Sequence, residues 1–191
     1  MKPIVVMIHG RGAGPENILD LVPRLDRPQF EYIAPAAPNR TWYPFSFMAE
    51  IEKNQPHLSE ALALMESVVH GAERGGVPRS RIVLLGFSQG ACLATEYLIR
   101  NASRFGGLIA FSGGAIGPKG TAWNYPGNFA GTPMFFGCSD VDAHVPADRV
   151  RESAAVCERM GATVTTAVYP GMGHLISDDE IRAARQLLDT V

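Results

Sequence analysis

Gly86-Phe87-Ser88-Gln89-Gly90 is the stretch that decides the fold of this chain. Residues 82–85 precede it as an apolar run that is typical of a buried strand, and residues 91–100 follow it with a helix-like composition. A serine between a strand and a helix lies on a sharp turn that pushes its hydroxyl out of the sheet. Side chains at positions 86 and 90 would collide in such a turn, which explains the two glycines. The helix that follows directs its free N–H groups toward the same point.

Strand-like and helix-like runs alternate along the whole chain, which predicts a mostly parallel sheet with helices on both faces. Strands are predicted at residues 4–8, 31–34, 82–85, 107–111, 133–137 and 163–169. Helices are predicted at residues 56–74, 91–100 and 148–160, and a capping box of Ser177 and Glu180 opens the last one. Only about 20 residues separate the fourth strand from the fifth, too few for a separate cap domain. We therefore expect one α/β domain over residues 1–191, with an open, shallow site covered by loops.

Composition narrows the possible partners and the compartment. The chain has 191 residues, of which 46% are hydrophobic and 19% charged, which is typical of a globular protein. The net charge is −2 and Lys and Arg do not cluster, which argues against binding to nucleic acid. We find neither a secretory signal nor an apolar run long enough for membrane insertion. Three cysteines without paired spacing indicate reduced thiols, so we expect a cytoplasmic protein.

The motif around Ser88 resembles the nucleophile elbow of α/β-hydrolases, in which an acid and then a histidine follow the serine along the chain. A histidine takes the proton of the serine, and a carboxylate orients the histidine. His174 follows the last predicted strand and is the predicted base. His57 and His70 fall inside a predicted helix, His9 is more typical of a structural residue, and His144 is too close to the acid in sequence. These four histidines are therefore not favoured as the base.

The acid and the oxyanion donors come from two loops. Asp140 and Asp142 both follow the fifth predicted strand, and the residues alone do not separate them. One oxyanion donor is the backbone N–H of Gln89, and the second is expected from residues 9–14, whose glycines allow a close approach of the backbone. Gly10 and Gly12 also permit a dinucleotide-binding interpretation. It is disfavoured because the next glycine, Gly14, follows at the wrong spacing and no acid ends the second strand.

Four motifs in order along the chain resemble the phospholipase/carboxylesterase family, which includes the acyl-protein thioesterases. They are His9-Gly10-Arg11-Gly12, Gly86-Phe87-Ser88-Gln89-Gly90, Asp140-x-Asp142-x-x-Val145-Pro146 and Gly171-Met172-Gly173-His174. The resemblance implies that Asp142, four residues before Pro146, is the catalytic acid. It also implies that the backbone of Arg11 is the first oxyanion donor. Residues 39–45 are unlike the eukaryotic thioesterases and similar to small bacterial carboxylesterases, which favours small esters.

The residues and the resemblance together predict a serine carboxylesterase that forms an acyl-enzyme on Ser88 and needs no metal or organic cofactor. The expected partner is a small-molecule ester, and the protein is expected to be a monomer or a homodimer. The alternatives are an acyl thioesterase, a lysophospholipase, and an inactive hydrolase-fold binding protein. The substrate pocket is predicted from aromatic residues, each of which could instead pack on the sheet edge: Trp42, Tyr43, Phe45 and Phe47, with Trp123 and Tyr125 at the border. The side chain of Arg11 is expected to form a surface ion pair or to meet a substrate carboxylate.

Overall fold

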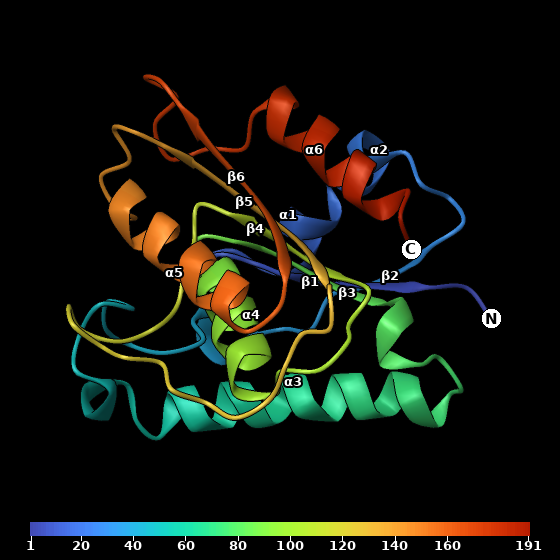
Figure 1. Cartoon of the computed structure of the whole chain (residues 1–191), viewed down its shortest axis with the longest axis horizontal. Helices are drawn as coiled ribbons and strands as arrows, with labels where there is room; N and C mark the ends of the chain where they lie inside the picture. The colour runs from blue at the N-terminus through green and yellow to red at the C-terminus, as the bar shows by residue number, and fades with distance from the viewer.

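The centre of the protein is a six-stranded parallel sheet in the order β2-β1-β3-β4-β5-β6 (Figure 1), in a computed structural model that describes residues 1–191. The strands are β1 (Ile4–Ile8), β2 (Glu31–Ile33), β3 (Ile82–Phe87), β4 (Gly107–Phe111), β5 (Pro133–Ser139) and β6 (Thr163–Tyr169). Every neighbouring pair runs parallel. The predicted single-domain α/β fold with a parallel sheet is confirmed.

Helices cover both faces of the sheet. One face carries α3 (His57–Arg74), α4 (Gln89–Arg100) and α5 (Ala147–Arg159), and the other carries α1 (Pro15–Leu19), α2 (Val22–Leu25) and α6 (Asp178–Leu188), as Figure 1 shows. Three short 3₁₀ helices, at Pro38–Arg40, Ile51–Asn54 and Arg79–Arg81, lie in the connections. None of the helices has the length and hydrophobicity needed to cross a lipid bilayer.

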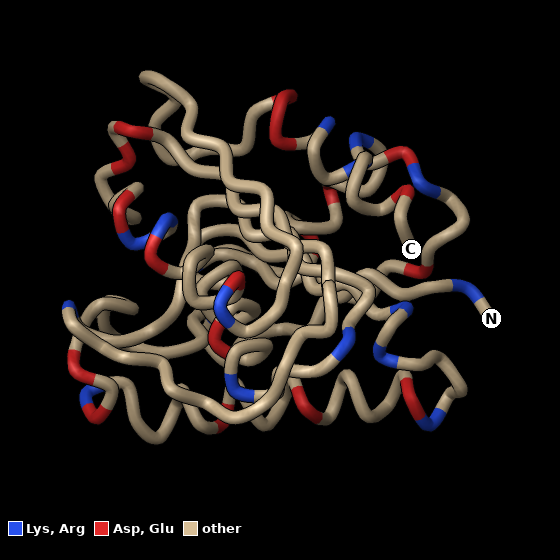
Figure 2. The backbone as a smooth tube through the Cα atoms, in the orientation of Figure 1, with Lys and Arg blue, Asp and Glu red and all other residues tan.

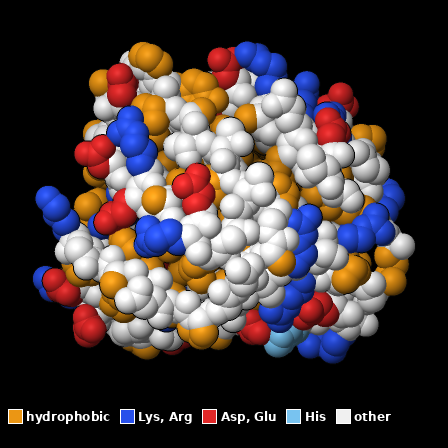
Figure 3. Space-filling model, viewed as in Figure 1, with side chains coloured by type: hydrophobic (Ala, Val, Ile, Leu, Met, Phe, Trp, Pro, Cys, Tyr) orange, Lys and Arg blue, Asp and Glu red, His pale blue; other side chains and the backbone are white.

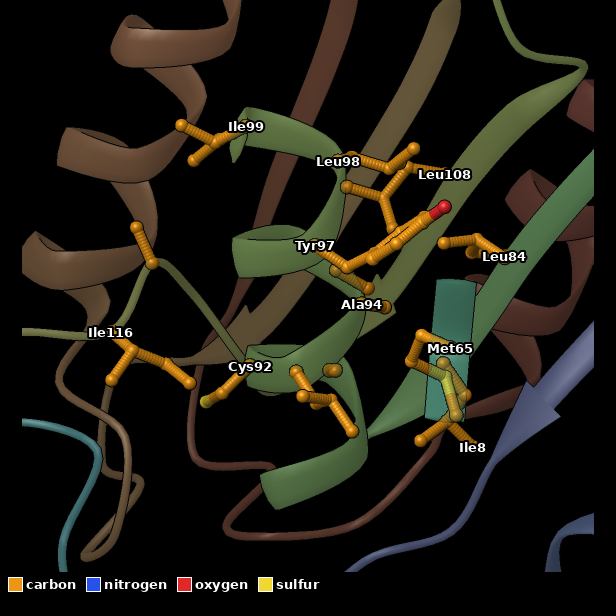
Figure 4. Close-up of a cluster of buried hydrophobic side chains, with 14 of the residues drawn as sticks. Ile8, Met65, Leu84, Cys92, Ala94, Tyr97, Leu98, Ile99, Leu108 and Ile116 are labelled. Atoms are coloured by element: carbon orange, nitrogen blue, oxygen red, sulfur yellow. The ribbon is translucent and has the colours of Figure 1, made fainter. Parts of the chain in front are cut away.

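Two apolar cores result from the alternation of side chains along the strands. In β1, Ile4, Val6 and Ile8 contribute to the larger core beneath α3, α4 and α5. Val5 and Met7 point to the opposite face and join the smaller core beneath α1, α2 and α6. Figure 4 shows part of the larger core, where Met65 of α3 and the side chains of α4 meet the strands.

α4 is buried along its length, from Gln89 to Ile99. Residues 112–132 connect β4 to β5 and help to bury α4. The Ile116 N–H in this connection donates to the buried carboxylate of Glu96 on α4 (2.9 Å). The same connection is held from α5 by Arg149, whose guanidinium donates to the carbonyls of Ala115 (3.1 Å) and Gly117 (2.7 Å). These residues form a loop that packs on the helices.

Charged residues lie mostly on the helices and loops, and the central strands are almost free of them (Figure 2). Basic and acidic side chains are interspersed on the face shown in Figure 3. Both chain ends lie together at one edge of the sheet (Figure 1), where Met1 and Val191 line the same surface cavity. That edge is opposite the carboxyl ends of the strands, where parallel α/β sheets bind their ligands.

Candidate active site

Ser88 lies on a strained turn between β3 and α4. Its backbone has φ 56° and ψ −121°, in a region that non-glycine residues rarely adopt. The turn brings the chain so close to its neighbours that a Cβ at Gly90 would lie 2.1 Å from the Ile8 carbonyl oxygen. A Cβ at Gly86 would lie 2.5 Å from the Ala91 nitrogen. The predicted need for glycine at both positions is therefore confirmed.

A chain of hydrogen bonds joins Ser88 to His174 and Asp142. His174 Nε2 lies 2.9 Å from Ser88 Oγ, and His174 Nδ1 lies 2.7 Å from Asp142 Oδ2. The three residues follow β3, β5 and β6, so they meet at the carboxyl edge of the sheet. The network is consistent with the tautomer in which Nδ1–H donates to Asp142 and Nε2 accepts from the Ser88 hydroxyl.

The carboxylate of Asp142 is completely buried and fully hydrogen-bonded. Its Oδ1 accepts from the backbone N–H groups of His144 (2.8 Å) and Val145 (3.0 Å), while Oδ2 faces His174. Burial raises the pKa of Asp142, but the hydrogen bonds from His174 and the two N–H groups outweigh it and hold this pKa below its usual value. Asp142 is therefore ionised at neutral pH and fixes the orientation of the imidazole.

Asp140, the other acid of this loop, binds backbone instead. Its Oδ1 accepts from the Gly171 N–H (2.8 Å), and the neighbouring Ser139 Oγ accepts from the Gly173 N–H (2.9 Å). Both contacts hold the loop that carries His174. The structure thus separates two carboxylates that the residues alone left as alternatives: Asp142 contacts His174, and Asp140 contacts the loop.

The two predicted oxyanion donors belong to segments that flank Ser88. Gln89 is the first residue of α4, so its N–H has no partner one turn earlier in the helix. The Arg11 N–H donates to no other group of the chain, whereas the next two N–H groups, of Gly12 and Ala13, do. Gly10 brings this loop against the elbow: a Cβ there would lie 3.5 Å from Ser88 Cβ. Two unpaired N–H groups next to a serine are suited to bind a negatively charged oxygen.

The side chains of the same two residues hold the neighbouring segment 42–45. The Gln89 amide accepts from the Trp42 N–H (3.0 Å) and donates to the Tyr43 carbonyl (2.8 Å). The Arg11 guanidinium donates to the carbonyls of Pro44 and Phe45, both at 2.7 Å. Arg11 therefore makes no surface ion pair, contrary to one of the two expectations for its side chain. Arg11 and Gln89 thus bind one backbone group of each residue from 42 to 45.

A cavity of about 410 Å³ opens beside Ser88 and His174. Tyr43, Phe45 and Phe47, the aromatic residues expected at the substrate pocket, line this cavity, and so does His144. The His144 ring lies edge-on to that of His174, with ring centroids 4.8 Å apart. Its nearness to the acid in sequence argues against His144 as the base. The same nearness brings His144 to the cavity, because the chain makes a tight turn at Asp142.

Trp42 was predicted to line the pocket, with Trp123 and Tyr125 at its border, but none of the three rings lines this cavity. Trp42 is buried, its indole N–H donates to the His9 carbonyl (2.8 Å), and it faces a separate cavity beside α3. Trp123 packs against the guanidinium of Arg149, 5.1 Å from its ring centroid. Tyr125 stacks with Arg100 on α4 (5.2 Å). Each ring packs on the domain instead of facing the site.

His9 and the three cysteines are buried, and their surroundings are those of structural residues. His9 is buried, and its Nε2 accepts from the Ala37 N–H (3.1 Å) while Nδ1 contacts the Gly10 carbonyl (2.9 Å). All three cysteines are free and buried. Burial raises the pKa of Cys92, which also lines the cavity, to about 12, so this thiol stays protonated and is a poor nucleophile.

The chain is similar to known proteins over its whole length. The family model described as phospholipase/carboxylesterase matches residues 1–191. The crystal structure of a phospholipase/carboxylesterase from Dyadobacter fermentans is 46% identical, covers 98% of this chain and 90% of its own, and superposes with a TM-score of 0.93. A probable carboxylesterase from Oryza sativa subsp. japonica is 23% identical over 95% of this chain and 85% of its own length. Acyl-protein thioesterase 1 from Yarrowia lipolytica is 23% identical over 93% of this chain and 86% of its own.

Proposed function

Because the chain belongs to the phospholipase/carboxylesterase family of α/β-hydrolases and is a hydrolase, we propose that it is a serine carboxylesterase that cleaves small or medium esters through an acyl-enzyme on Ser88. The single observation that carries the proposal is the hydrogen-bond chain from Asp142 through His174 to Ser88, with distances of 2.7 and 2.9 Å. This arrangement is what a serine needs to become a nucleophile at neutral pH.

The proposed reaction has two halves. Ser88 Oγ attacks the ester carbonyl while His174 Nε2 takes its proton, and the N–H groups of Arg11 and Gln89 bind the oxyanion that develops. His174 then donates this proton to the leaving alcohol, which departs and leaves the acyl group on Ser88. In the second half, His174 activates a water molecule, and its attack releases the acid and restores the serine. Asp142 stabilises the imidazolium in both halves.

The size of the site supports small or medium esters. The cavity volume of about 410 Å³ lies near the lower end of the range for small-molecule sites, about 300–1,000 Å³. Phe45 and Phe47 offer apolar surface to the acyl or alcohol part. Thioester hydrolysis is the second candidate function, because several relatives are named acyl-protein thioesterase 1.

The proposal is tested with p-nitrophenyl esters from acetate to palmitate and with a fluorophosphonate probe, which labels activated serines. Wild type is expected to hydrolyse the shorter esters and to be labelled at Ser88. Ser88→Ala should lose about 10⁶-fold in kcat, by analogy with other triad deletions. The control is Ser67→Ala, which changes an exposed serine on α3 and should keep full activity. An unlabelled wild type that cleaves no ester would instead support the inactive binding protein.

The preferred leaving group needs a separate assay. Short- and long-chain acyl thioesters are tested as competitors of the best p-nitrophenyl ester. A carboxylesterase with a small pocket is expected to be inhibited weakly by the long-chain thioester. Strong competition together with thiol release would favour the thioesterase.

A further inference from the structure

Arg11 contributes more than a backbone N–H to the candidate active site. Its side chain lines the same cavity as Ser88 and His174 and remains exposed to solvent. The two hydrogen bonds to the carbonyls of Pro44 and Phe45, each 2.7 Å long, fix the guanidinium in one position. A fixed guanidinium loses less side-chain entropy when it binds a ligand than a mobile one does.

The guanidinium has free donors and no counter-charge. A guanidinium carries five N–H donors, and the contacts with the two carbonyls use one on each terminal nitrogen. No carboxylate of the chain pairs with Arg11. Glu16, the nearest acid along its loop, pairs with Arg40 instead (3.2 Å). The positive charge of Arg11 is thus left for a ligand.

The rest of the cavity does not compensate this charge. None of the lining residues is Asp or Glu, whereas Arg11, His144 and His174 are all present. The one carboxylate next to the site, Asp142, is completely buried behind His174 and already accepts three hydrogen bonds. α4 begins at Gln89 and directs the positive end of its dipole toward the same cavity.

We propose that the ester bound by this site carries a negatively charged group, a carboxylate in the simplest case, which binds the guanidinium of Arg11. This inference rests on the proposed esterase function. Because the side chain of Arg11 is three methylenes long, its guanidinium lies several bonds from its own backbone N–H, which is the proposed oxyanion donor. The carboxylate would therefore lie a few carbons from the ester carbonyl, on either the acyl or the alcohol side.

Matched pairs of stable esters test the charge preference with the wild-type protein. On the acyl side, monomethyl succinate is compared with methyl levulinate, which has a neutral methyl ketone in place of the carboxylate. On the alcohol side, acetoxyacetate is compared with acetoxyacetone. The anionic member of at least one pair is expected to have a kcat/KM about tenfold higher, the size of a charge-assisted hydrogen bond. The preference should shrink as salt increases, because ions screen an exposed charge.

Two kinds of variant assign the preference to Arg11. Arg11→Gln keeps the backbone N–H and removes the charge, so the ratio of anionic to neutral kcat/KM should fall toward one. Since this change also releases the carbonyls of Pro44 and Phe45, a second test adds charge at a tolerant position. Phe45 is 54% exposed and lines the cavity, so a polar side chain should be tolerated there. Phe45→Glu and Phe45→Gln introduce side chains of the same shape that differ only in charge. The ratio should be lower in Phe45→Glu than in Phe45→Gln.

The outcomes separate this inference from the function on which it rests. If wild type cleaves the neutral esters as well as the anionic ones, or if the ratio is the same in all the variants, the role of Arg11 is wrong and the esterase stands. If wild type cleaves no ester and resists the fluorophosphonate probe, the esterase itself is wrong and the inference is overturned with it.

Discussion

Asp140 and Asp142 lie two residues apart in the loop after β5, yet their carboxylates bind different partners. Asp142 is buried against His174, whereas Asp140 is exposed and accepts from the Gly171 N–H. The side chain between them, Val141, points to solvent with 61% of its surface exposed. A single tight turn therefore directs one acid to the imidazole and the other to the backbone of the adjacent loop.

This difference predicts unequal effects of the same substitution. Asp142→Asn keeps the shape of the side chain but favours the wrong tautomer of His174, so kcat on a short p-nitrophenyl ester should fall about 10⁴-fold. Asp140→Asn is its matched control and should cost far less, because an amide oxygen still accepts from the Gly171 N–H. The reverse order of the two variants would exchange the roles of the two acids.

The residues of the site could be predicted only where a motif fixes the local backbone. Ser88 follows a strand that is evident from its apolar run, and His174 follows one that is evident from alternating, β-branched residues; the structure brings their side chains within hydrogen-bond distance. The choice between Asp140 and Asp142 depends on the path of a loop, which the residues do not encode in a periodic pattern. Its aromatic ring predicts Trp42 in the pocket, but its indole N–H donates to the buried carbonyl of His9 and holds the ring elsewhere. The catalytic roles stay predictions until the variants are measured.

At the level of elements, the elbow between β3 and α4 depends on contact with β1. A Cβ at position 90 would lie 2.1 Å from the Ile8 carbonyl oxygen and 2.6 Å from that of His9, and both are backbone atoms that cannot rotate away. Gly90→Ala should therefore lower the free energy of unfolding by about 1–3 kcal/mol or more, as overpacking does.

Gly71→Ala is the control for this substitution. Gly71 lies inside α3, and a Cβ there would meet nothing within 4 Å. The added methyl should raise the free energy of unfolding by about 0.5–1 kcal/mol, because alanine favours helices over glycine. Urea unfolding measures both variants. Equal free energies of unfolding for Gly90→Ala and wild type would contradict this prediction, because they would mean that the backbone of β1 shifts to accommodate the methyl group without loss of stability.

The N-terminus of α6 contains a buried acid whose contribution to stability is expected to depend on pH. Glu180 accepts from the Ser177 N–H (2.8 Å) and hydroxyl (3.1 Å), but its Oε1 is buried without a partner. Burial raises the pKa of Glu180, the contacts with Ser177 lower it, and the net pKa lies above its usual value. The stabilisation from this raised pKa is present below about pH 4, near the pKa of an unfolded glutamate, and is lost as the pH rises through the folded-state pKa.

Glu180→Gln removes this titration and retains a capping side chain. Relative to wild type, the free energy of unfolding of Glu180→Gln should therefore be higher at pH 7 than at pH 4. Urea unfolding at the two pH values measures the difference. Glu158→Gln, at an exposed position of α5, is the control. A Glu180→Gln effect that is the same at both pH values would mean that Glu180 does not couple folding to protons.

The predicted elements were those with a periodic or apolar pattern, β-branched alternation or a capping box. All six strands and the four long helices were predicted within a few residues, and the capping box at Ser177 is formed as expected. α1 (Pro15–Leu19) and α2 (Val22–Leu25) were missed. Each is about one turn long, too short for a helical period to repeat, and forms because Ile18 and Leu25 pack on the sheet.

For the molecule as a whole, the buried guanidinium of Arg149 joins α5 to the connection between β4 and β5. It donates to the Ala115 and Gly117 carbonyls and lies over the rings of Trp123 (5.1 Å) and Phe47 (5.8 Å). Sequence reasoning did not single out Arg149, because arginines are mostly exposed and its partners lie in a loop without a pattern. A charged side chain thus organises a large part of the irregular structure.

Arg149→Lys should lower the free energy of unfolding by about 1–3 kcal/mol, because a lysine cannot keep both carbonyl contacts and the stacking. Arg151→Lys, two residues away and exposed, should change it by less than about 0.5 kcal/mol. Chemical denaturation measures both. An Arg149→Lys variant as stable as wild type would show that the packing of residues 112–132 does not depend on the guanidinium.

The hydrogen bonds from Arg11 and Gln89 to residues 42–45 have a kinetic consequence. The same two residues carry the proposed oxyanion donors. Residues 42–45, which form one wall of the cavity, are therefore expected to move together with these N–H groups. An acyl group too large for the cavity would push this wall outward and misalign the N–H groups at the moment when charge develops. A misplacement of about 1 Å can slow the chemical step about 100-fold. Oversized substrates should therefore show a lower kcat in addition to a higher KM.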